Sequence, residues 1–97
     1  GLSRTAHFLC ETFKRLEAVD LVSGFAATMP ITQVEIADAL GMSPVHMNRI
    51  VKDMRERRLI TIDGQRVEIL DWDALVQLGD FDSSYLHLDP GRRPERP

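Results

Sequence analysis

The sequence predicts an α+β, mainly α-helical domain of the winged helix-turn-helix class. We expect a three-helix core, a small β-hairpin wing and a C-terminal helix. Two helix-start signals, at Thr32 and Ser43, follow one another closely with Gly41 between them. Two short β-rich segments around Asp63-Gly64 come directly afterwards, where a wing follows a helix-turn-helix.

The first core helix is expected over residues 4–18. Leu9, Phe13 and Leu16 recur at i, i+4 and i+7, which is the spacing of one helical face. Glycine and proline interrupt this pattern over residues 19–31, so we expect a loop there with a short strand near residues 25–29.

The helix-turn-helix is expected over about residues 32–56. Thr32 and Glu35 fit a capping box, and the helix that they start should run to Leu40. Gly41 can adopt the left-handed conformation that ends a helix. Ser43 can then cap the next helix, with Pro44 at its first position, where the missing N–H is not needed.

The second of these helices, over residues 43–56, has one apolar side. At about 100° per residue, this side holds Met47, Ile50, Val51 and Met54, which we expect to be buried. The opposite, exposed side holds Val45, Arg49, Lys52 and Glu56, with Asn48 and His46 on its two edges. The exposed side is therefore the candidate binding surface.

The wing is expected over about residues 59–70, with strands at 59–62 and 67–70 around a four-residue turn, 63–66. Asp71 should cap a last helix over about 72–78, which Trp72 packs onto the domain. A short turn is predicted at 82–87, and the domain should end near residue 88. Residues 89–97 hold three prolines and no large apolar residue, so we expect them to be disordered.

Composition indicates one small cytoplasmic domain. The 97 residues carry a net charge of −3, and the single cysteine, Cys10, allows no internal disulfide. No apolar run approaches the ~20 residues that span a membrane, and a domain of this size offers little room for a catalytic cleft, so we expect no enzyme. Residues 43–58 hold five basic and two acidic side chains, a local charge of +3. Because DNA responds to the charge of the face it meets, the acidic total does not exclude DNA binding.

The segments AHFLCETFKRL and TQVEIADALGMSPVHMNRIVKDMRERRLI resemble the C-terminal DNA-binding domain of the Crp/Fnr family of transcription regulators. The ending DWDALVQLGDFDSSYLHL is similar to that of alphaproteobacterial members. The resemblance implies a sequence-specific reader of double-stranded DNA that acts as a homodimer on a near-palindromic operator, with RNA polymerase as a further partner. The family's N-terminal sensing domain and dimer helix have no counterpart in these residues, so we expect a part of a longer regulator, without a cofactor of its own.

The resemblance also implies roles for individual residues. Ser43 and Gln33 match phosphate-binding positions, Arg49 matches an arginine that reads guanine, and Gln65 with Arg66 matches a wing tip that touches the backbone. The best-known members carry an arginine and a glutamate after the serine, whereas this chain has Pro44 and Val45. The usual half-site sequence is therefore not expected here.

Other roles rest on position and chemistry alone. Lys52, one turn beyond Asn48 and Arg49, is assigned to phosphate, and His46 is a further phosphate candidate. Val45 can contact a thymine methyl group, and Asn48 can read adenine. The candidate base-reading set is thus Val45, Asn48 and Arg49.

Two alternatives compete with DNA binding. A protein-interaction winged helix without specific DNA binding would use the acidic last third of the chain to meet a basic partner. His7 and Cys10 are spaced i, i+3 on one helix, but they lack the further ligands that a metal site needs. We therefore expect no metal site, but a packed cysteine beside a half-buried histidine.

Overall fold

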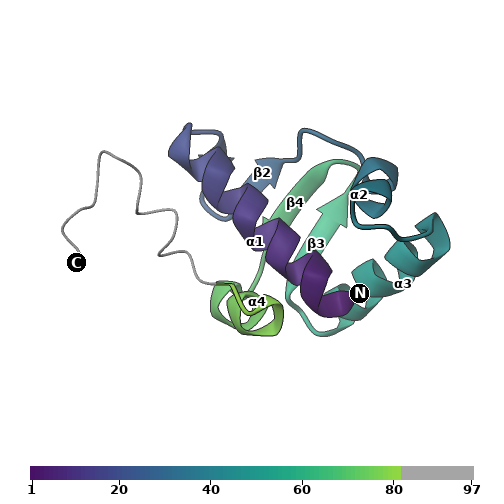
Figure 1. Cartoon of the computed structure of the whole chain (residues 1–97). Coiled ribbons are helices and arrows are strands. Elements are labelled where there is room, and N and C mark those ends of the chain that lie inside the picture. Colours follow the sequence, from purple (N-terminus) through teal and green to yellow (C-terminus); the bar gives the residue numbers. More distant parts are fainter. Residues whose placement is uncertain (82–97) are drawn as a thin grey trace, which may run out of the picture.

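The computed structural model describes residues 1–81 and contains four helices and four strands (Figure 1). In chain order these are α1 (Leu2–Ala18), β1 (Val22–Ser23), β2 (Ala26–Thr28), α2 (Gln33–Ala39), α3 (Pro44–Glu56), β3 (Ile60–Asp63), β4 (Arg66–Ile69) and α4 (Trp72–Gly79). The predicted turn at 82–87, the domain end at 88 and the disordered tail at 89–97 lie outside the described residues.

The strands form one antiparallel sheet in the order β1-β2-β4-β3. The predicted strand near residues 25–29 is β2, and it pairs with the wing strand β4 through Ala27 and Val67. The wing is therefore one half of a four-stranded sheet. The two-residue strand β1 had no sequence signal, because two residues are too few to show an alternating pattern.

The turn of the wing is shorter than predicted. Asp63 pairs with Arg66 as the last residues of β3 and β4, so the loop is Gly64-Gln65. Gly64 has φ +62°, whereas Gln65 is not among the residues with positive φ. A glycine with positive φ at the first of two loop residues is the type II′ arrangement, which suits the twist of paired strands.

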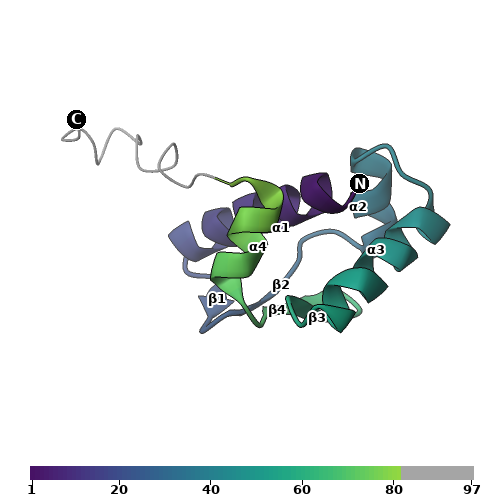
Figure 2. The ribbon, with the colours of Figure 1, turned by 90° about the horizontal axis from the view of Figure 1, so that it is seen from below.

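The core lies between the sheet and the helices that cover it. Figure 2 shows α1 and α4 packed together on one side of the strands, with α2 and α3 at the end of the molecule. Phe13 on α1 lies 6.0 Å from the ring of Trp72, which packs α4 onto the domain as predicted. Cys10 is fully buried and His7 is half-buried, where its Nδ1 lies 3.1 Å from the carbonyl oxygen of Gly79.

The helix-turn-helix has the predicted caps. Thr32 Oγ1 accepts a hydrogen bond from the Glu35 amide at 3.1 Å, and Glu35 Oε1 accepts one from the Thr32 amide at 2.8 Å. Gly41 has φ +72° after the first helix, and Ser43 Oγ caps the second. The caps fix where α3 begins and therefore which of its side chains face outward.

Candidate nucleic-acid interface

The exposed side of α3 is the one that helical spacing predicts. Val45 is 62% exposed, and Arg49, Lys52 and Glu56 are also exposed. The opposite side is buried against the domain through Met47, Ile50, Val51 and Met54. Because the apolar side of α3 packs against the domain, the helix turns Val45 and three charged side chains, Arg49, Lys52 and Glu56, to solvent.

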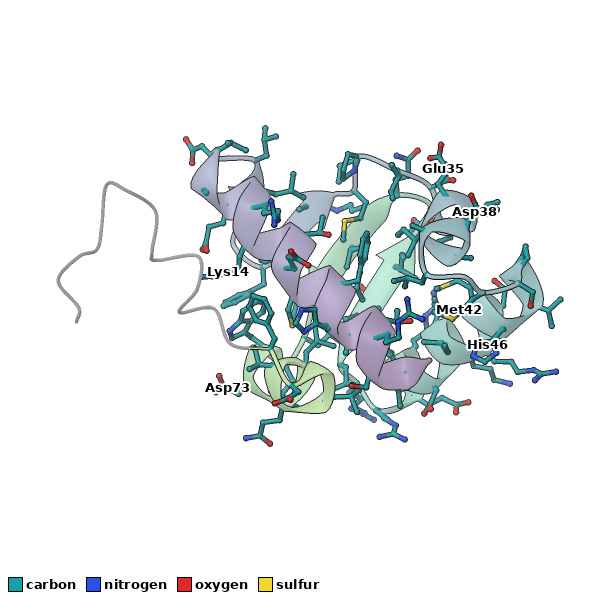
Figure 3. All side chains as sticks on the ribbon, viewed as in Figure 1. Lys14, Glu35, Asp38, Met42, His46 and Asp73 are labelled. Atoms are coloured by element: carbon teal, nitrogen blue, oxygen red, sulfur yellow. The ribbon has the colours of Figure 1, made fainter. Side chains whose placement is uncertain are left out.

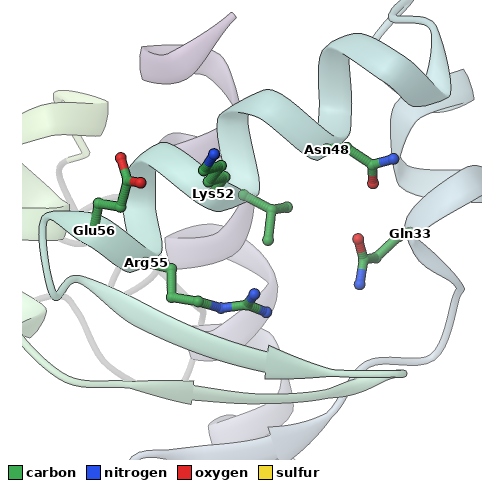
Figure 4. A pocket seen from close by; sticks show the side chains of 6 residues that line it. Gln33, Asn48, Lys52, Arg55 and Glu56 are labelled. Carbon is green, nitrogen blue, oxygen red and sulfur yellow. The ribbon is translucent and has the colours of Figure 1, made fainter.

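Three predicted phosphate- or base-contacting residues come together at one hollow. Gln33 at the start of α2, together with Asn48 and Lys52 on α3, lines an open hollow of about 560 Å³. Figure 4 shows the amide side chains of Gln33 and Asn48 pointing toward one another from the two helices. The remaining lining residues are Val51, Arg55 and Glu56. The hollow lies along the edge of α3 that holds Asn48, which was predicted to flank the exposed side of the helix.

His46 lies on the other edge of α3, beside the start of α1 (Figure 3). A Cβ placed on Gly1 would lie 2.7 Å from His46 Nε2, so the imidazole is close to that backbone. Ser43 Oγ accepts a hydrogen bond from the His46 amide at 3.1 Å. The Ser43 hydroxyl hydrogen can still be donated to a phosphate oxygen while the cap is kept.

The two predicted wing residues face other surroundings. Gln65 Nε2 donates a hydrogen bond to the Met29 carbonyl oxygen at 2.8 Å, which engages one of its amide hydrogens within the domain. Arg66 lines a separate hollow of about 450 Å³ beside β1 and β2, and Asp20 and Thr28 also line this hollow. Neither Gln65 nor Arg66 lines the hollow between α2 and α3.

Arg55 is the residue of this interface that the sequence did not single out. It lies in the basic run 55–58, whose members the sequence does not distinguish. In the structure, Arg55 Nη2 donates a hydrogen bond to the Ile62 carbonyl oxygen at 2.8 Å, and Arg55 lines the hollow (Figure 4). Arg57 instead forms an ion pair with Asp53 at 2.8 Å.

The cations of the α3 surface are not neutralised by neighbouring carboxylates. Within residues 1–81, Arg49, Lys52 and Arg55 form no ion pair. The same part of the chain holds no group of three or more His, Cys, Asp or Glu side chains arranged for a metal ion. None of its helices has the length and apolar character needed to cross a bilayer.

A capped helix-turn-helix, a wing and an exposed polar second helix define a winged helix-turn-helix domain. The family of Crp-like helix-turn-helix domains matches residues 3–78, and the chain belongs to this family of DNA-binding domains from transcription regulators. No curated protein matches the chain.

Solved structures of Crp-type regulators share the fold. FixK2 from Bradyrhizobium japonicum is 20% identical with a TM-score of 0.67, over 79% of this chain and 37% of FixK2. CprK in complex with OCPA is 16% identical with a TM-score of 0.65, over 80% of this chain and 37% of CprK. TTHB099, a CRP-family transcriptional regulator from Thermus thermophilus, is 22% identical with a TM-score of 0.53, over 81% of this chain and 38% of its own. This chain thus spans just over a third of the length of these structures.

Proposed function

We propose that this chain is the sequence-specific DNA-binding domain of a bacterial transcription regulator. In this proposal α3 enters the major groove of a near-palindromic operator, and the whole regulator binds as a homodimer in the cytoplasm. The observation that carries the proposal is the exposed side of α3, where Arg49 and Lys52 stand without carboxylate partners among residues 1–81. A dimer would place its two recognition helices about 34 Å apart, one turn of DNA.

Phosphate contacts set the position of the domain on the duplex. Gln33 and Lys52 reach one backbone from the hollow beside α3, and Ser43 donates its hydroxyl hydrogen at the start of the helix. His46 meets a phosphate from the other edge of α3, and Gln65 and Arg66 meet the backbone at the wing. The duplex is thereby held from both edges of the recognition helix.

Base contacts supply the sequence preference. Arg49 is suited to a bidentate contact with guanine O6 and N7, and Asn48 to adenine N6 and N7. Val45 offers its methyl groups to a thymine methyl, since it is exposed in the first turn of α3. RNA polymerase is the further partner that such a regulator meets at a promoter.

The competing function is a protein-interaction module without specific DNA binding. One observation favours it: Val19, Leu21 and Phe25, around the end of α1 and the first hairpin, are 56–63% exposed. Exposed apolar side chains mark contact surfaces between proteins where they form a contiguous patch.

Selection from random duplexes separates the two functions. The chain, both alone and joined to a dimerising coiled coil, is used to enrich binding sequences. Sequence-specific binding predicts a near-palindromic consensus, and Arg49→Ala should relax one position in each half-site, by about 1–3 kcal/mol. Arg15→Ala, in the last turn of α1, is the matched control and should leave the consensus unchanged. If no sequence is enriched by the dimerised protein, specific DNA binding is excluded.

A further inference from the structure

We propose that Arg55 binds a phosphate of the DNA backbone and is oriented for this contact by the wing strand β3. The inference rests on the proposed function and adds to it a binding residue outside the family-matched positions. The wing would then contribute to DNA binding in a second way, because its strand β3 orients the guanidinium of Arg55.

The orientation follows from one hydrogen bond. Arg55 Nη2 donates to the Ile62 carbonyl oxygen at 2.8 Å, which joins the last turns of α3 to β3. A guanidinium is a rigid planar fork with five N–H donors, and this bond engages one of them. Because the fork is planar, a hydrogen bond at one nitrogen restricts the directions that the other donors can take. Less side-chain entropy is then lost when a phosphate binds.

The surroundings of Arg55 suit an anion. It lines the same hollow as Lys52, Gln33 and Asn48, so two cationic and two amide side chains border one hollow (Figure 4). Glu56 is the one carboxylate among the lining residues, which leaves an excess of one positive charge. Arg55 forms no ion pair within residues 1–81, so its charge is available to a ligand. Phosphate oxygens match the geometry of such a fork.

The neighbouring arginine provides an internal comparison. Arg57 is two residues further on and is 53% exposed, but its Nε donates to Asp53 Oδ1 at 2.8 Å. Arg57 does not line the hollow. Both arginines lie at the end of α3, and replacing either one removes one positive charge. They differ in that Arg55 lines the hollow and Arg57 does not.

The test is a salt titration of duplex binding by the 97-residue chain, with Arg55→Gln and Arg57→Gln as a matched pair. Losing one phosphate contact should make the slope of log Kobs against log salt shallower by about 0.9 for Arg55→Gln. The loss should be equal for the selected operator and for random duplex. Arg57→Gln should keep the slope of the unaltered chain. An unchanged slope for Arg55→Gln, in a chain that otherwise binds DNA, would overturn the inference.

A second measurement does not depend on the stability of Arg55→Gln. Single methylphosphonate linkages, which are neutral, are placed in turn along the operator and their effect on binding is measured with the unaltered chain and with Arg55→Lys. Lysine keeps the charge but loses the fork, so one linkage should have a smaller effect on Arg55→Lys than on the unaltered chain. Identical profiles would overturn the inference, whereas failure of the unaltered chain to bind any duplex would overturn the proposed function itself.

Discussion

Gln65 and Met29 hold one another through two hydrogen bonds. Gln65 Nε2 donates to the Met29 carbonyl oxygen at 2.8 Å, and the Met29 amide donates to the Gln65 carbonyl oxygen at 2.7 Å. The bonds join the turn of the wing to the segment that leads into α2. They therefore fix the wing relative to the entrance of the helix-turn-helix, although the two residues are 36 positions apart in the chain.

We predict that Gln65→Ala lowers the free energy of unfolding by about 1 kcal/mol, the net worth of one intramolecular hydrogen bond. Urea denaturation followed by circular dichroism measures this change. Gln77→Ala, on the exposed face of α4, is the control and should stay within about 0.5 kcal/mol of the unaltered chain. Equal stability of the two variants would show that the side-chain bond to Met29 contributes nothing.

Gly79→Ala should destabilise the domain although alanine favours helices. A Cβ at Gly79 would lie 2.5 Å from the backbone nitrogen of His7, on the facing helix α1. Helix propensity alone would stabilise the variant by up to about 1 kcal/mol, but forcing the helices apart should produce a net loss of about 1–3 kcal/mol. Thermal unfolding measures the sign.

Gly41→Asn is the matched control for Gly79→Ala. Gly41 has φ +72° and open space around its Cα, and asparagine tolerates this conformation better than other residues with a side chain. Its midpoint of unfolding should stay close to that of the unaltered chain. A Gly79→Ala variant that melts at a higher temperature would show that α1 and α4 can separate without cost.

The features that could be predicted from the sequence are local ones. The caps at Thr32, Ser43 and Asp71 each join a side chain to an amide three residues later, so they were visible as short motifs. The buried side of α3 followed from helical spacing alone. The pairing of Ala27 with Val67 was not predictable, because it depends on segments forty positions apart.

The candidate site divides in the same way. The exposed positions of α3 were predicted, because one helix determines them. The place of Arg55 depends on the strand that returns beside α3, and the bond of Gln65 depends on the segment before α2. Both contacts exist only in the folded chain, so neither role could be inferred from residue type and spacing.

Cys10 should make stability fall at alkaline pH. Burial raises the pKa of its thiol from 9.0 to about 12, so between these values the unfolded chain releases a proton that the folded chain retains. The contribution of this thiol is fully present below pH 9 and is lost as pH rises toward 12. Between these two pKa values, the free energy of unfolding should fall by up to about 1.4 kcal/mol per pH unit, the value for one proton.

Urea denaturation at about pH 8 and about pH 10, on either side of the ordinary thiol pKa, measures the effect of Cys10. Cys10→Ala creates a small cavity and is expected to be less stable at both values, but its stability should fall less between them. The difference between the two chains isolates the contribution of the thiol from every other pH-dependent contribution that the two chains share. If the free energy of unfolding falls by the same amount in both chains between the two pH values, the raised pKa of the Cys10 thiol is contradicted.

Val45 and its contact with a thymine methyl group give the last prediction. Val45 is 62% exposed in the first turn of α3. The preceding residue, Pro44, lines a hollow together with Val34 of α2. Once an operator has been selected, each thymine in a half-site is replaced in turn by deoxyuridine, which removes only the methyl group. One such replacement should weaken binding by the unaltered chain, by about 0.8 kcal/mol for one buried methyl.

The same replacement should have little effect on Val45→Ala, because the alanine side chain no longer reaches the methyl group. Val19→Ala, which shortens an equally exposed valine outside the helix-turn-helix, should keep the full sensitivity of the unaltered chain. In a double-mutant cycle, the coupling energy between Val45 and the methyl group is the loss of binding caused by deoxyuridine in the unaltered chain minus the loss in Val45→Ala. A sensitivity to deoxyuridine that persists in Val45→Ala assigns the thymine contact to another residue, and Val45 then serves only to fill the groove.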